Sequence, residues 1–229
     1  MIKNKKFALI LIAHADDETL GAGGTILKLI EKGWLVNVVA LSDGKLTVRG
    51  KKQDNSKDFK NACEFLGVKK YSLLKFKDQK FDTFAISNLA NAVANLKLQP
   101  DLIITHHHED LNKDHRITCE VAKIIGRPKK KPISILGCEI PGTSFWNGKV
   151  FQANYYVDIS NHIDSKIEAF SKYRNEIQEY PHPWSKKGLK LLAQYHGMQS
   201  GFKYAEAFNV IRGYEDRLIN INNENLPKS

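Results

Sequence analysis

The fold is decided by Phe7–Ala13 (FALILIA), an unbroken apolar run that leads directly into His14–Thr19 (HADDET). An apolar run of this length is typical of a strand covered on both faces. The acidic residues that follow are typical of the first turn of a helix. Apolar positions continue at helical spacing from Leu20, and Gly33 provides a stop. This stretch therefore predicts a buried strand followed at once by a helix.

The same alternation continues outward from this stretch. Further strands are expected at 35–41, 71–74, 101–105 and 133–138, and helices at about 54–66, 84–98 and 114–125. Residues 42–53 are polar and are expected to form a loop. Strands that alternate with helices predict an α/β fold: a three-layer, Rossmann-like, mostly parallel sheet with helices on both faces.

The pattern becomes looser in the C-terminal third of the chain. We expect an edge strand at 155–159, a helix at about 161–178, a break at Tyr180–Trp184 (YPHPW) and a helix at about 185–195. We expect one domain over 1–229, with a Rossmann-like core at about 1–140, a C-terminal α/β part at about 141–219 and a polar tail at about 220–229.

Composition excludes several classes of protein. With 229 residues, 42% hydrophobic and 26% charged, the chain is neither disordered nor collagen-like nor a disulfide-stapled miniprotein. The net charge of +10 is scattered, which favours an anionic small substrate or solubility over a nucleic-acid surface. Three widely spaced cysteines predict reduced, buried thiols in a cytoplasmic protein.

The N-terminus resembles a minimal signal peptide, because lysines precede the apolar run and Ala13-His14-Ala15 imitates a cleavage site. Cleavage there would destroy the best candidate site in the chain, so we expect no export. No apolar stretch approaches the roughly 20 residues of a membrane helix. The protein is therefore expected not to be transmembrane.

Two loops rich in nitrogen and oxygen ligands follow predicted strands, at His14–Glu18 and at His106–His115. Ligands bind outside the carboxyl ends of such strands. His14 and Asp17 can point at one position, and His115 would complete a set of two imidazoles and one carboxylate. A set with an open fourth position is typical of catalytic zinc.

Two acidic residues next to the candidate ligands remain free for other roles. Asp16 is expected to act on a water molecule, and Asp114 to orient a ligand imidazole or the partners of Asp16. Each feature also has a simpler interpretation: a turn histidine, an acid-rich first helical turn at Asp16–Thr19 and a solvated loop at His106–His108. Because both clusters are predicted at one edge of the sheet, a metal site is the favoured interpretation.

The run Ala13–Glu18 (AHADDE) resembles the A-H-P-D-D-E signature of the PIG-L/LmbE-like family of zinc-dependent N-deacetylases. The glycines after Leu20 and the segment Asp114–Arg116 (DHR) also match motifs of that family. Glu139 with its neighbours, Trp146 and the stretch Tyr204–Phe208 are similar to the sugar-deacetylase branch.

This resemblance implies that His14, Asp17 and His115 bind one Zn²⁺ and that Asp16 is the general base. It implies removal of the N-acetyl group from an N-acetylglucosamine-type sugar or glycoconjugate. Two positions depart from the family pattern. Ala15 replaces a proline, and Asn112 replaces a histidine that assists many members. Asn112 is therefore a candidate to stabilise the oxyanion, and its role is left open. The choice between zinc and iron is also left open.

The substrate and partners are less defined by the sequence. Arg49, in a basic loop, Asp110 and Glu139 are candidate substrate contacts, and the linkage of the sugar to a nucleotide, phosphate or lipid remains open. The aromatic residues Trp146, Tyr180, His182 and Trp184 suit either sugar stacking or packing. Alternative functions are hydrolysis of another amide, such as a thiol conjugate, or a non-catalytic sugar- or nucleotide-binding module. A homo-oligomer is possible, and no nucleic-acid partner is expected.

Overall fold

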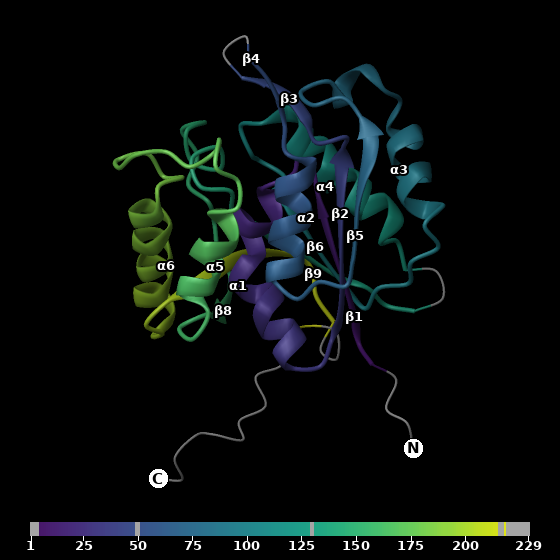
Figure 1. Ribbon diagram of the computed structural model, residues 1–229. Helices are drawn as coiled ribbons and strands as arrows, with labels where there is room; N and C mark the ends of the chain where they lie inside the picture. Colours follow the sequence, from purple (N-terminus) through teal and green to yellow (C-terminus); the bar gives the residue numbers. More distant parts are fainter. Residues whose placement is uncertain (1–4, 49–50, 129–130, 215–217, 219–229) are drawn as a thin grey trace.

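The computed structural model describes residues 5–48, 51–128, 131–214 and 218 (Figure 1). A seven-stranded sheet has the order β5-β2-β1-β6-β7-β9-β8. The first five of these strands are parallel, whereas β9 runs antiparallel to both β7 and β8. The strands are β1 (Phe7–Ile12), β2 (Leu35–Ser42), β5 (Lys70–Phe76), β6 (Leu102–His106), β7 (Ser134–Cys138), β8 (Tyr155–Asp158) and β9 (Ala205–Arg212). The prediction of a mostly parallel α/β sheet is confirmed.

Helices cover both faces of this sheet (Figure 1). One layer contains α1 (Asp17–Glu31), α2 (Ser56–Phe65), α5 (Ile163–Phe170) and α6 (Lys186–Ser200), and the other contains α3 (Ile86–Ala94) and α4 (Lys113–Ile125). A short 3₁₀ helix (Phe81–Thr83) precedes α3. The position of β1 between two cores explains why its sequence is apolar throughout. Ile10 packs into one core and Leu11 into the other.

Residues 42–53 do not form the expected loop throughout. The chain forms a separate hairpin of β3 (Lys45–Val48) and β4 (Lys51–Asp54), which pair in antiparallel register. Strand β4 (KKQD) consists of polar residues only, so it lacks the alternation by which a strand is predicted.

Two C-terminal elements also differ from the prediction. Helix α5 ends at Phe170, and the chain then turns so that Tyr173 is buried. Strand β9 was not predicted, although it lies inside the sheet between β7 and β8. Glu206 interrupts the apolar pattern of β9, and its carboxylate has a specific buried role.

That role is an ion pair between the sheet and two helices. The buried Lys166 ammonium lies 2.5 Å from Glu206 Oε1 and donates a hydrogen bond to the Leu20 carbonyl oxygen. The two carboxylate oxygens of Glu206 accept hydrogen bonds from the backbone N–H groups of Gly24 and Thr25. Glu206 therefore connects β9 to α1 and α5.

Removing the cation of this pair is expected to be strongly destabilising. We expect Lys166→Met to lower the free energy of unfolding by about 3–5 kcal/mol, because a carboxylate would remain buried without its partner. The matched control is Lys172→Met, which removes a more exposed pair with Glu168 and should change stability by less than about 1 kcal/mol. Urea unfolding of both variants measures the difference, and equal midpoints would contradict this role for Glu206.

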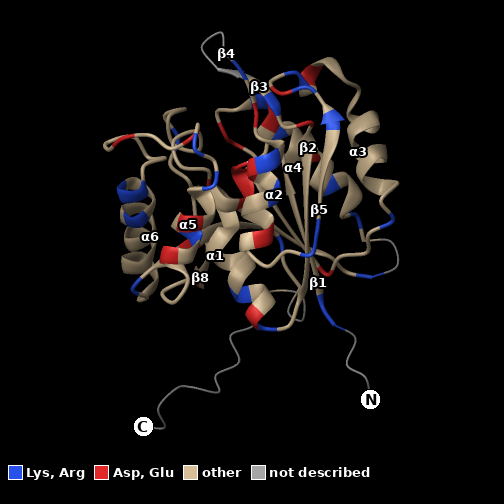
Figure 2. Ribbon diagram, in the orientation of Figure 1, with Lys and Arg blue, Asp and Glu red and all other residues tan. Residues whose placement is uncertain are grey.

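Charged residues are distributed widely over the molecule. Figure 2 shows Lys and Arg on many elements rather than on one face of the protein. Among the described residues, no helix has the combination of length and apolar character needed to cross a lipid bilayer.

Candidate metal centre

The two ligand-rich loops meet because β1 and β6 are neighbours in the parallel sheet. His14 follows the end of β1, and Asp17 is the first residue of α1. His115 lies in the first turn of α4, the helix that follows β6. The carboxyl ends of parallel strands thus place these three side chains at one edge of the sheet.

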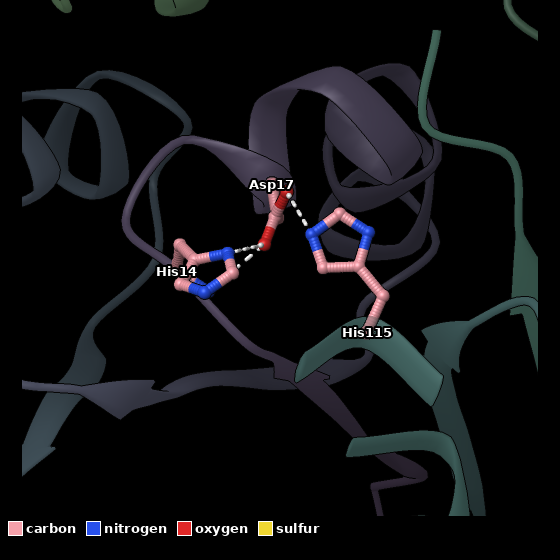
Figure 3. A group of neighbouring side chains, drawn as sticks. All are labelled: His14, Asp17 and His115. Carbon is pink, nitrogen blue, oxygen red and sulfur yellow. Dashed lines mark hydrogen bonds and ion pairs between the residues drawn. The ribbon is translucent and has the colours of Figure 1, made fainter. Parts of the chain in front are cut away.

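Asp17 lies between the two imidazole rings (Figure 3). Its Oδ2 is 3.4 Å from His14 Nδ1, and its Oδ1 is 3.5 Å from His115 Nε2. One ligand atom from each residue lies within 4.8 Å of the others. Two imidazoles and one carboxylate match a catalytic zinc site that keeps a position open for water or substrate. The donor set therefore fits a divalent metal ion.

Carboxylates contact the outer nitrogens of both histidines. His14 Nε2 lies 3.2 Å from Asp114 Oδ2 and 3.1 Å from Asp78 Oδ1, while His115 Nδ1 lies 3.1 Å from Asp110 Oδ1. The nitrogens nearer to Asp17 are left to face the centre. Metal-binding histidines are typically oriented in this way by a carboxylate.

These contacts also set the charge of the centre. Burial lowers the pKa of His14, but hydrogen bonds to Asp114 and Asp17 outweigh burial and raise it well above the usual value. Burial raises the pKa of Asp17, but the neighbouring imidazoles of His115 and His106 favour its charged form and hold that pKa well below the usual range. Asp17 is therefore a carboxylate, as metal binding requires.

Asp110, predicted as a candidate substrate contact, instead faces the protein. Its carboxylate accepts hydrogen bonds from the hydroxyls of Ser144 and Thr143, at 2.7 and 3.0 Å, in addition to contacting His115. The side chain is buried. Its position behind His115 gives it an orienting role rather than a place in the cavity.

Replacing this carboxylate should weaken metal binding without removing a ligand. We expect Asp110→Asn to lower zinc affinity by about 10–100-fold, the usual effect of altering a group behind a metal-binding histidine. Competition with a fluorescent chelator measures the change. The control is Glu168→Gln, which alters an exposed carboxylate on α5 that pairs with Lys172 and does not line the cavity. An unchanged zinc affinity in Asp110→Asn would exclude the orienting role.

His106 is a member of the centre that the sequence did not single out. Its ring stacks on His115 with 3.9 Å between centroids, and its Nε2 accepts a hydrogen bond from the Ala13 N–H. Burial and the His115 charge lower its pKa to about 4, so it is neutral near pH 7. His106 and His107 are buried, so the solvated-loop interpretation is wrong for both and holds only for His108.

Asp16 lies beside the three candidate ligands but is not one of them. Its backbone has φ 126°, a left-handed conformation that is unusual outside glycine, and its N–H donates to Glu18 Oε2. Burial, Asp17 and Glu176 raise its pKa well above the usual value. Glu18 is held in turn by the Tyr173 hydroxyl, 2.5 Å from Oε1. The turn that presents Asp16 is thus fixed by buried neighbours.

A cavity of about 660 Å³ opens over the centre, and Asp16, Asp17, His14 and His115 line it. Asn112 also lines it, although its side-chain oxygen caps α4 by accepting the Asp114 N–H. Glu139 is placed elsewhere, with its carboxylate 2.6 Å from His196 Nε2, and it does not line this cavity. Arg49 lies outside the described residues.

The chain is similar in sequence to known proteins. Residues 9–125 match the family described as "PIG-L: GlcNAc-PI de-N-acetylase". Diacetylchitobiose deacetylase of Thermococcus kodakarensis is 26% identical, over 91% of this chain and 84% of that protein. A probable N-acetyl-alpha-D-glucosaminyl L-malate deacetylase of Bacillus cereus is 23% identical, over 76% of this chain and 85% of that protein.

A solved structure with another activity shares the same fold. The 4-carboxy-2-hydroxymuconate hydratase of Pseudomonas putida has a TM-score of 0.73 at 20% identity, with 91% of this chain and 97% of that chain covered. This likeness concerns the fold alone. The activity must therefore be argued from the site.

Proposed function

Because this chain belongs to the PIG-L family, we propose that it is a metal-dependent N-deacetylase that acts on an N-acetylglucosamine-type amino sugar or glycoconjugate. One observation carries the proposal: Asp16 lines the cavity beside a full donor set but is not part of that set. A site that only bound a metal or a sugar would not need such a residue. The names of both relatives contain an acetylated glucosamine, whereas the remainder of the substrate differs between them.

His14, Asp17 and His115 would hold the metal, and zinc is our choice for this donor set. When bound, such an ion polarises a carbonyl group and acidifies a water molecule to a pKa near 7. The protein contributes the orientation of both imidazoles through Asp114 and Asp110.

In the proposed reaction, Asp16 accepts the proton of the water that attacks the acetamide carbonyl carbon. The same carboxyl group then donates that proton to the departing amine nitrogen, because an amide nitrogen leaves poorly while unprotonated. The raised pKa of Asp16 suits a group that must both accept and release a proton near neutral pH. Asn112 lines the same cavity and is our candidate for an oxyanion donor.

A cytoplasmic location is part of the proposal, and the thiols support it. Cys63, Cys119 and Cys138 are buried and unbridged, a state that suits a reducing environment. We therefore place the enzyme in the cytoplasm.

The test is release of a primary amine from N-acetylated sugars by the zinc-loaded protein, with and without chelator. The panel contains free N-acetylglucosamine, its disaccharide, a nucleotide-linked form and a phosphatidyl-linked form. Chelator-sensitive release that returns with added zinc is the expected result. If a protein shown to hold one metal ion released no amine from any of them, another amide or a binding role would replace this proposal.

A further inference from the structure

One part of the cavity wall is aromatic. Trp146, His182 and Trp184 all line the cavity and follow one another at 5.7 and 5.9 Å between ring centroids, each pair nearly perpendicular. Trp146 lines the cavity and is 54% exposed. A large apolar ring exposed in a cavity is available for a ligand.

Contacts with the backbone position both indoles of the aromatic wall, which is formed by Trp146, His182 and Trp184. One face of the Trp146 indole lies against Gly142, where an added Cβ would be 3.0 Å from the ring. The Trp184 indole N–H donates to the Pro141 carbonyl oxygen at 2.7 Å. Both indoles are therefore held by the same short backbone segment. Rigid, amphipathic aromatic side chains supply contact area at a low entropic cost.

The rest of the lining indicates which chemistry would lie against these rings. Amide side chains line the cavity around the aromatic wall and suit the hydroxyl groups of a sugar: Gln53, Asn55, Gln79, Asn112, Asn175 and Gln178. Of the aliphatic residues, the cavity presents Ala15 and Leu46. An acyl chain would therefore find little apolar surface.

The charge of the lining opposes an anionic substituent. Asp16, Asp17, Asp78 and Glu176 all line the cavity, whereas Lys45 is the single lysine or arginine among its described lining residues. Among the described lining residues, carboxyl groups therefore outnumber the lysine and arginine side chains that could hold a phosphate.

We propose that Trp146, His182 and Trp184 form a subsite for a second, uncharged sugar ring joined to the N-acetylated one. The substrate is then a neutral oligosaccharide or glycoside, rather than a nucleotide-, phosphate- or lipid-linked sugar. This inference rests on the proposed function. The cavity of about 660 Å³ is within the range of sites that hold ligands larger than one sugar ring.

The experiment compares kcat/KM for N-acetylglucosamine, N-acetylglucosamine 1-phosphate and N,N′-diacetylchitobiose. We expect the disaccharide to be the best substrate and the phosphate the poorest. Trp146→Ala should lower kcat/KM about tenfold for the disaccharide and less than about twofold for the monosaccharide, since one aromatic contact is lost. Trp146→Phe should retain most of the preference. Tyr195→Ala, an exposed aromatic on α6 that does not line the cavity, is the control.

A binding measurement separates this inference from the proposed function. Calorimetric titration of zinc-loaded Asp16→Asn with the disaccharide, with and without Trp146→Ala, reports the subsite without turnover. If the protein binds the disaccharide through Trp146 but deacetylates none of the sugars, the subsite is retained and the proposed deacetylase activity is excluded. The subsite is excluded if Trp146→Ala lowers kcat/KM equally for both neutral sugars, or if the protein prefers the phosphate. Absence of sugar binding altogether would overturn both.

Discussion

Asp16→Asn is expected to lower kcat by about 10²–10⁴-fold, the range that a positioned acid–base group contributes, while the protein keeps one zinc ion per chain. The amide of asparagine has nearly the shape of the carboxyl group but cannot accept a proton from water or return one to the amine. The His14, Asp17 and His115 side chains are untouched. The variant therefore separates proton transfer from metal binding.

Metal content by mass spectrometry and initial rates on one sugar substrate measure both quantities in the same preparation. Asp164→Asn is the matched control, because Asp164 is 85% exposed in its side chain and lies on α5, away from the cavity lining. It should have wild-type activity and metal content. Loss of zinc from Asp16→Asn would mean that Asp16 is a ligand, and full activity would mean that another group is the base.

His115→Ala is expected to lose both zinc and activity. Only His14 and Asp17 would remain as donors, and Asp110 would be left buried without the imidazole that it now contacts. The fall in zinc affinity should exceed the roughly 10–100-fold effect of altering a group behind a ligand. His162→Ala, which removes an imidazole that contacts Glu31 outside the cavity lining, should bind zinc like the unmodified protein. Full zinc occupancy in His115→Ala would remove His115 from the ligand set.

The sequence was sufficient to predict that His14, Asp17 and His115 come together. Each follows a strongly apolar strand, and β1 and β6 are neighbours in a parallel sheet, so their loops share one edge. The continuous apolar pattern of β1 predicted that this strand is buried on both faces. The two hydrophobic cores, one against each face, confirm this prediction.

Asp114, which contacts His14, was expected from the sequence as an orienting group, but the other supporting groups could not be predicted in the same way. Asp78 contacts His14 and Tyr173 contacts Glu18, both from irregular segments, where no periodicity shows which way a side chain points. His106 ends a strand, and its stacking on His115 depends on where α4 begins. Glu139 had a motif resemblance but no positional signal, and its partner, His196, lies 57 residues along the chain.

The bonds from Glu206 to α1 have a consequence for how the protein is made. Gly24 and Glu206 are separated by 182 positions. During synthesis, helix α1, which begins at Asp17, therefore leaves the ribosome long before β9, the strand that anchors it. Such distant pairing forms slowly. We therefore propose that residues of about 1–140 and about 141–219 fold as one unit, in which the centre matures only when β9 enters the sheet. Shortened forms that stop before β9 would be poor tools for studying this enzyme.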